Sequence, residues 1–273
     1  ALDADNRPVA KTELTAAEPL FADLVAKGGA TVAQSRKSDA GAARDRAVGA
    51  DAESLSPDAL AAADAALAAA DVLLAAGDVK GAIAAYGLAI TAFDAAEKRS
   101  AAVAVKAEVD ELDYGPLDAG NYEIAGHKVA AVDELIANDP KAAQDAAEEA
   151  LLRYRLVLSK GWELTAGGKR DDAEKYKIYA ESIKAQVAVK DEYAEAKSVW
   201  DEAVALYDSG DHEGSVPTFE LAEELFAEVY DMAAIKREEA EAAIKAAGSK
   251  NAESESIAEQ GDQALEAPED GED

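Results

Sequence analysis

The stretch that decides the fold lies at residues 77–112, which read GDVKGAIAAYGLAITAFDAAEKRSAAVAVKAEVDEL. No proline interrupts it, and small or apolar residues recur after Gly77-Asp78 in alternating steps of three and four. Ser100 fills the one gap in this series, which otherwise consists of Ala82, Tyr86, Ala89, Phe93, Ala96, Val103 and Ala107. Such heptad-like spacing predicts a long helix with a narrow seam that packs against other helices.

Helical signals continue on both sides of this stretch. Ser56-Pro57-Asp58 is a helix start, with Ser as N-cap and Pro at the first helical position, and this helix should reach about Ala76. No segment shows the alternation of a β-strand, so the sequence predicts an all-α fold. The remaining breaks are Tyr114-Gly115-Pro116, Asp139-Pro140, Ala166-Gly167-Gly168 and Gly210-Asp211, and the helices expected between them cover about 121–138, 141–164, 171–207 and 215–247.

Composition narrows the function classes. The 273 residues include 27 Lys and Arg against 57 Asp and Glu, for a net charge of −30, and 69 of them are Ala. Ala favours helices and close helix packing. The charge argues against nucleic acid and anionic membrane surfaces as partners. No run of large apolar residues approaches a membrane span, so we expect no direct membrane insertion. The absence of Cys excludes thiol catalysis and Cys-ligated zinc.

Charge divides the chain into three expected parts. Residues 1–50 hold seven acidic and seven basic residues, and we expect short helices there. Residues 51–247 carry a net charge of −22 and form the expected helical-repeat domain. Residues 248–273 hold nine acidic residues and one basic residue without a sustained apolar period, so we expect an acidic, disordered tail.

Four glycines suggest an internal repeat. Gly77, Gly120, Gly168 and Gly210 are followed at five, nine and twelve positions by small or apolar residues, with Lys177 as the exception. Gly can end one helix in the left-handed conformation, and the Asp or Asn after Gly77, Gly120 and Gly210 can cap the next helix. The glycines lie 43, 48 and 42 residues apart, which predicts helical hairpins with long arms.

In this pattern the chain resembles tetratricopeptide-type repeats, over roughly residues 55–235. The most similar unit begins near Tyr154, and Val157, Gly161, Leu164, Gly168, Ala173 and Ala180 occupy its small and apolar positions. The glycine spacings exceed the roughly 34 residues of that repeat. The resemblance implies long antiparallel helical hairpins stacked as a tetratricopeptide-like array or irregular bundle.

A second resemblance is to the Ala-rich, acidic helical proteins of spirochaete envelopes, some of which accompany peptidoglycan-binding modules. The segments that carry it are 118–123 and 230–245, and no such module is visible here. The chain begins with Ala1 rather than Met, which we interpret as a mature chain after signal removal or as a trimmed chain. We therefore expect a periplasmic or otherwise extracytoplasmic location, with the cytoplasm as the alternative.

Candidate catalytic and metal sites are sparse. His127 and His212 are the two His residues, and neither has the neighbours of a metal site. Asp208 to Glu213 could hold calcium, but the loop lacks EF-hand spacing, and helix capping explains its acids better. Residues 161–169 lack the pattern of a phosphate-binding loop. We predict no enzyme activity, no cofactor and no bound metal.

Aromatic and basic side chains supply the candidate binding residues. The stretch from Arg153 to Trp162 is locally basic and aromatic in an acidic background, and we expect it to face a groove that binds a protein or peptide. The candidate protein-binding residues are Arg153, Arg155, Trp162, Tyr176 and Trp200.

The sequence thus favours a non-enzymatic scaffold or adaptor that mediates protein–protein interaction. One alternative is a self-associating, coiled-coil-like protein, a possible homo-oligomer in which heptads over 219–247 pair between chains. The other is a transporter-accessory protein that binds a small molecule between hairpins. A long open groove would favour the scaffold, and a large pocket would favour the last alternative.

Overall fold

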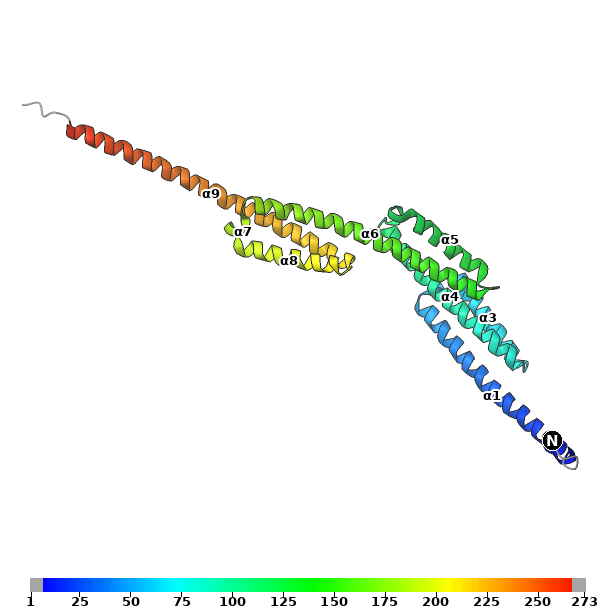
Figure 1. The fold of residues 1–273 in the computed structure, drawn as a ribbon. Coiled ribbons are helices and arrows are strands. Elements are labelled where there is room, and N and C mark those ends of the chain that lie inside the picture. The colour runs from blue at the N-terminus through cyan, green and yellow to red at the C-terminus, as the bar shows by residue number, and fades with distance from the viewer. Residues whose placement is uncertain (1–6, 267–273) are drawn as a thin grey trace, which may run out of the picture. The chain divides into compact units, whose positions relative to one another are not determined.

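The computed structural model describes residues 7–266, and these form helices joined by short connections. No strand occurs in this range, so the all-α prediction is confirmed. The chain divides into two compact units, residues 1–161 and residues 162–273. In order, the elements are α1 (Arg7–Gly49), α2 (Ala52–Leu55), α3 (Pro57–Ala75), α4 (Val79–Glu111), the 3₁₀ helix η2 (Gly115–Asp118), α5 (Ala119–Leu135), α6 (Pro140–Ser182), α7 (Ala185–Ala188), α8 (Lys190–Asp208) and α9 (His212–Glu266) (Figure 1).

The first unit contains a core that α1, α3 and the first half of α4 build together. Tyr86 of α4 is fully buried, and it packs in one cluster with Ala40 of α1 and Ala70 of α3. Ion pairs join the same helices, between Arg44 and Asp64 at 2.7 Å and between Lys37 and Asp71 at 2.9 Å. Because most core residues are Ala, these helices approach closely, as the Ala-rich seam predicts.

Helix α4 then enters a second core with α5 and the first half of α6. The predicted seam holds from Ala82 to Ser100, all fully buried, but beyond Ser100 the buried positions are Ala102 and Val109. Ala102 packs with Ala125 of α5 and with residues of α6. The seam shifts because the second half of α4 faces a different pair of helices, and the expected contact of Ala107 is wrong, since Ala107 is exposed.

The second unit repeats the first core with a constant offset of 133 residues. Its helices are the second half of α6, α8 and α9, and the short α7 corresponds to α2. The turn glycines Gly77 and Gly210 both have positive φ, at 81° and 87°, a conformation that favours glycine. Buried pairs at the same offset are Ala40 and Ala173, Ala47 and Ala180, Ala63 and Ala196, Ala70 and Ala203, Tyr86 and Phe219, Ala89 and Ala222, and Phe93 and Phe226.

One capping turn starts the third helix of each core. The side chains of Asp78, Asp139 and Asp211 each accept a hydrogen bond from the backbone N–H three residues later, at 2.9, 3.1 and 3.0 Å. Five buried positions then follow 4, 8, 11, 15 and 18 residues after each Asp. They are Ala82, Tyr86, Ala89, Phe93 and Ala96 in α4, Ala143, Ala147, Ala150, Tyr154 and Val157 in α6, and Ser215, Phe219, Ala222, Phe226 and Val229 in α9.

The four-glycine repeat is therefore half right. Gly77 and Gly210 form the predicted turns, whereas Gly120 lies inside α5 and Gly168 lies inside α6. Helix α6 runs through the predicted break at Gly167-Gly168 because Ala166 and Ala173 on either side are buried in a continuous seam. It ends instead at Ser182, just before Lys184, which has a φ of 63°.

The structure also corrects the expected parts of the chain. The expected short helices within residues 1–50 are one helix, α1, which includes Pro19. The expected disordered tail is helical as far as Glu266, and the last seven residues of that tail lie outside the described range. The boundary between the compact units falls after Gly161, inside the single repeat domain expected for residues 51–247.

Helix α4 is long and apolar enough to cross a membrane by length and composition alone. In the structure this helix contributes buried residues to two helix cores, among them Phe93 and Ala102. Buried core helices of soluble proteins also have this length and composition, so these two properties alone do not identify a membrane span.

Candidate functional site

The basic stretch of α6 does not form the single binding face expected from the sequence. The guanidinium of Arg153 donates to Glu149 at 2.7 and 2.9 Å and to the side chain of Asn121 on α5 at 2.8 Å. Tyr154 is fully buried and packs edge-on against Tyr122, with ring centroids 5.6 Å apart. Arg155 is exposed. Two positions along a helix are about 200° apart, so Arg153 and Arg155 point away from each other.

The other three predicted residues belong to the second unit. Trp162 is half-buried at its start. Tyr176 and Trp200 both pack, half-buried, against the cluster that contains Phe226 and Val229. The Trp200 ring also lies edge-on to Phe219 at 5.5 Å, and the ammonium of Lys177 is 5.9 Å from its centre. The structure thus brings Tyr176 and Trp200 onto one cluster, and the first of them has further aromatic neighbours.

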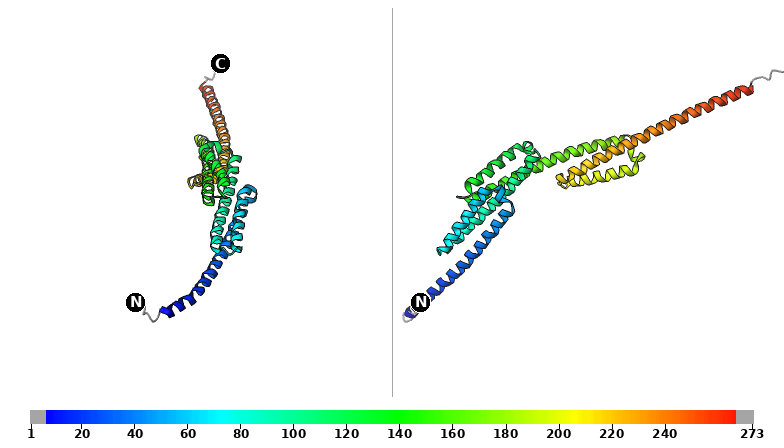
Figure 2. Two further views of the ribbon diagram at one scale, coloured as in Figure 1. Left: turned by 90° about the vertical axis from the view of Figure 1, so that its right-hand side faces the viewer. Right: turned by 180° about the vertical axis from the view of Figure 1, so that it is seen from behind.

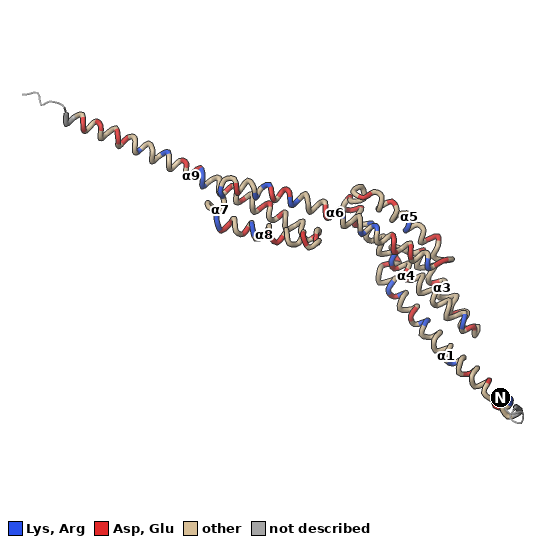
Figure 3. Tube along the Cα trace, viewed as in Figure 1, with Lys and Arg blue, Asp and Glu red and all other residues tan. Residues whose placement is uncertain are grey.

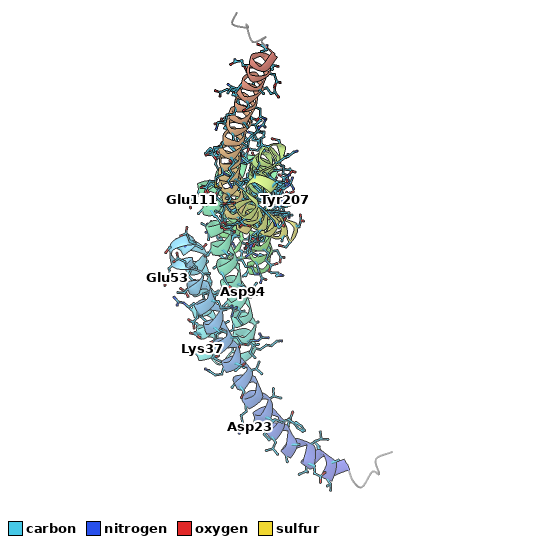
Figure 4. The ribbon with its side chains drawn as sticks, turned by 90° about the vertical axis from the view of Figure 1, so that its left-hand side faces the viewer. Asp23, Lys37, Glu53, Asp94, Glu111 and Tyr207 are labelled. Carbon is cyan, nitrogen blue, oxygen red and sulfur yellow. The ribbon has the colours of Figure 1, made fainter. Side chains whose placement is uncertain are left out.

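Some aromatic residues of the second unit occupy positions that hold charged or small residues in the first unit. In the first unit Arg46 of α1 forms ion pairs with Asp94 and Glu97 of α4, at 2.7 and 3.3 Å. The positions of Arg46 and Glu97 are Tyr179 and Tyr230 in the second unit. Ala43, one turn earlier on α1, likewise corresponds to Tyr176. An ion-paired surface in one unit is therefore an aromatic surface in the other. Figure 4 shows the first unit's Asp94 on α4.

We call Tyr176, Tyr179 and Tyr230 the tyrosine patch. The rings of Tyr176 and Tyr179 are 6.0 Å apart and nearly perpendicular, and those of Tyr179 and Tyr230 are 6.3 Å apart. Tyr179 is 44% exposed although its ring contacts both neighbours. Sequence reasoning missed Tyr179 and Tyr230 as site residues, because the signal that marks them is the ion pair at the equivalent positions.

The hydroxyl groups separate structural tyrosines from available ones. Tyr86, Tyr122 and Tyr193 donate to Asp71, Asp110 and Glu181, the last two at 2.6 and 2.7 Å, and so tie one helix to another. Within residues 7–266, none of the three hydroxyls of the tyrosine patch forms a hydrogen bond. They are free to bond to a partner molecule, and tyrosine rings with such hydroxyls are common anchors in protein interfaces.

The titratable groups with shifted pKa values have structural explanations. Burial, and next the hydrogen bond to Glu181, raise the pKa of Tyr193 to about 12. Burial and the bond to Asp71 do the same for the pKa of Tyr86, also to about 12. The pKa of Asp71 is lowered by its bonds to Tyr86 and Lys37. Each of these groups joins two helices, which accounts for the shifts without a catalytic role.

The acidic turn at Asp208 to Glu213 behaves as a helix cap. The Asp211 carboxylate accepts from the Gly214 N–H, and His212 packs against Tyr207 with ring centroids 4.7 Å apart. No group of three or more His, Cys, Asp or Glu residues that could hold a metal occurs in the part of the chain that the structure describes. The hydrogen bond from the Gly214 N–H supports the capping interpretation of Asp211.

One hollow lies where α4 meets η2 and α5. It encloses about 480 Å³, and Asp110, Pro116 and Tyr122 are among the residues that line it. The Asp110 carboxylate is already bonded to Lys106 at 2.5 Å and to Tyr122 at 2.6 Å. This carboxylate of the wall is thus occupied by contacts within the chain.

The sequence is similar to that of a spirochaete membrane protein. The chain is 22% identical over 167 residues to "Treponemal membrane protein A" of Treponema phagedenis. The match covers 61% of this chain and 48% of that protein, so the chain spans about half the length of the relative. This similarity, at 22% identity, supports the expected likeness to spirochaete envelope proteins. No protein-family model and no solved structure matches the chain, and no tetratricopeptide family is shown.

Proposed function

We propose that this protein is a non-enzymatic helical scaffold of a spirochaete-type envelope, and that it binds another protein through the tyrosine patch. The observation that carries the proposal is the replacement of the Arg46–Glu97 ion pair by Tyr179 and Tyr230 at equivalent positions. Both pairs occupy the same place in the helix packing, so packing alone does not require two large rings there.

The chemistry of the patch also indicates a partner class. Tyrosine rings bind apolar side chains and the flat faces of guanidinium groups, and their free hydroxyls accept or donate hydrogen bonds. The surrounding chain carries a strong negative charge, with acidic residues along α8 and α9 (Figure 3). A partner segment that presents Arg or Lys together with apolar side chains matches both features.

The envelope location rests on the similarity to Treponemal membrane protein A. The transporter-accessory alternative has less support, since the Asp110 carboxylate in this hollow is already bonded to Lys106 and Tyr122.

The test places a photo-crosslinking amino acid at position 179 in cells that produce the protein. Position 244 is the control, because Ile244 is 73% exposed on α9, outside the patch. We expect one discrete heterologous product from position 179, no such product from position 244, and loss of the product when Tyr230→Ala is added. Truncating an anchor Tyr should weaken binding about tenfold or more. Equal products from both positions, or no effect of Tyr230→Ala, would refute the assignment.

A further inference from the structure

The first 22 residues of α1 present an apolar face that no other described helix of the first unit covers. A Cβ atom on Gly29 would stand 3.1 Å from a methyl group of Val79, so residues 29 onward lie beside the α3–α4 connection. Residues 7–28 extend past it, as two views show, and Asp23 is labelled on this free part (Figures 2 and 4). Leu14 is 72% exposed and Phe21 is 67% exposed, which is unusual for side chains of this size.

This face has the pattern of the third helix of a core. In α4, α6 and α9, five buried residues follow the capping Asp at 4, 8, 11, 15 and 18 positions. Counting the same way from position 6 gives Ala10, Leu14, Ala17, Phe21 and Leu24. Small and large residues alternate from Ala10 to Phe21 as they do from Ala82 to Phe93, and Leu24 is large where Ala96 is small. A face that is buried three times elsewhere in the chain is therefore exposed here.

The same segment does not stabilise itself as a lone helix. Pro19 removes one backbone hydrogen bond from its middle, and Gly28 and Gly29 are poor helix formers. These features indicate a segment that a packed neighbour would stabilise.

We propose that the occupant is a second copy of this chain, with the two α1 segments packed antiparallel over residues 10–28. The central pair is complementary in side-chain size, and the pairs further out match in size. If residues whose numbers add to 38 face each other, Ala17 of one chain lies against Phe21 of the other, and Leu14 lies against Leu24. The end pair, Ala10 against Gly28, is small on both sides, and a Cβ on Gly28 would meet no atom within 4 Å in the single chain.

Charge and length also favour a second copy. Residues 7–32 contain three basic and three acidic residues, whereas the whole chain has a net charge of −30. Two copies can therefore meet along this segment without the repulsion that opposes contact between their acidic parts. The same pairing sets Gly29 of one chain against position 9 of the other, so each folded body ends where the free helix of its partner begins.

The structure argues against the seam that the sequence favoured for self-association. Over 219–233 the heptad residues are buried within the second unit, including Phe219, Phe226 and Ala233. Beyond Ala233, α9 is exposed and rich in acidic residues. Pairing of 219–247 between chains would thus require the second unit to open, whereas residues 10–28 of α1 need no rearrangement.

The first experiment measures the mass of the full chain by light scattering over a concentration series. We expect a dimer of the 28.3 kDa chain, conversion to monomer in Phe21→Lys, and a dimer in Ile244→Lys. Ile244 is a matched control because it is equally exposed on a helix and receives the same charge. Since Phe21 is exposed, circular dichroism of Phe21→Lys should show the body still folded. A monomer at every concentration, as for a face that receives a different protein, would overturn the proposal, as would a dimer that Phe21→Lys leaves intact.

The second experiment tests the relative direction of the two helices by disulfide crosslinking, which is possible because the chain has no native Cys. Ala10→Cys and Gly28→Cys chains are oxidised separately and as a mixture. Antiparallel pairing predicts a disulfide-linked dimer in the mixture and little in either variant alone. Linkage of each variant with itself, and no link between the two different variants in the mixture, would show parallel pairing and overturn the arrangement. Because the tyrosine patch plays no part in either experiment, its own test stands or falls separately.

Discussion

The continuity of α6 can be tested with two glycines of the second unit that should respond oppositely to the same substitution. Gly168 lies inside α6 with no atom within 4 Å of an added Cβ, whereas Gly210 has a φ of 87° in the turn before α9. Ala gains about 0.8–1 kcal/mol over Gly in a helix interior. At a left-handed position a side chain costs roughly 1–2 kcal/mol. We expect Gly168→Ala to stabilise the unit and Gly210→Ala to destabilise it, so that the two variants differ by about 2–3 kcal/mol.

The assay is urea unfolding followed by tryptophan fluorescence. Both tryptophans of the chain, Trp162 and Trp200, lie in residues 162–273, so the signal reports the second unit. If Gly168 were a helix-ending turn, as the glycine spacing predicts, Gly168→Ala would lower the free energy of unfolding about as much as Gly210→Ala. That result would refute the continuous helix and restore the four-turn repeat.

Three further predictions concern packing and pH. Gly161→Ala should destabilise the first unit by about 1–2 kcal/mol in thermal unfolding followed by circular dichroism, because an added Cβ would stand 2.0 Å from the Tyr114 ring; an unchanged midpoint would contradict this packing. Phe226→Ala should cost about 3–5 kcal/mol in urea unfolding and Tyr179→Ala within about 0.5 kcal/mol, since the first ring is fully buried and the second is 44% exposed; similar losses would contradict the assigned burial. The pKa of Tyr193 is raised to about 12, against about 10 in the unfolded chain. The stability that this shift contributes is therefore complete below pH 10 and is lost as the pH rises towards 12. Unfolding followed by fluorescence at several pH values should show this loss in the free energy of unfolding, and Tyr193→Phe should abolish the pH dependence that Tyr193 causes.

Helix identity was largely predictable because Ala-rich seams and strong start signals act locally. Ser56-Pro57 begins α3, and Gly77-Asp78 and Gly210-Asp211 end one helix and cap the next, as the sequence indicates. Left-handed turns without Gly were not predictable. Asp51, Asp113 and Lys184 adopt positive φ because the packing of the flanking helices fixes the chain there, at an energetic cost that the sequence does not reveal.

The candidate site was predicted less well than the fold. Tyr176 and Trp200 were found because aromatics are rare in this chain, and both lie on one cluster. Arg153 looked available in sequence, but its partners Glu149 and Asn121 come from one turn away and from another helix. The second kind of contact depends on tertiary structure. Tyr179 needed the comparison with Arg46, which only the register of the two units provides.

Because α4 and α6 each contribute to two cores, the described segments that lie outside any core are at the two outer helices, α1 and α9. Because α4 completes one triplet and opens the next, each added core requires only two new helices. Within the described residues, α1 before Gly29 and α9 beyond Ala233 take part in no buried core, so each leaves one side without a packed neighbour. Solenoid proteins meet the same problem with polar terminal caps. Here α9 beyond Ala233 is exposed and rich in acidic residues, whereas α1 before Gly29 has a neutral charge balance and exposes the apolar side chains of Leu14, Phe21 and Leu24. The two segments are thus chemically unequal, and the first is the one suited to joining molecules.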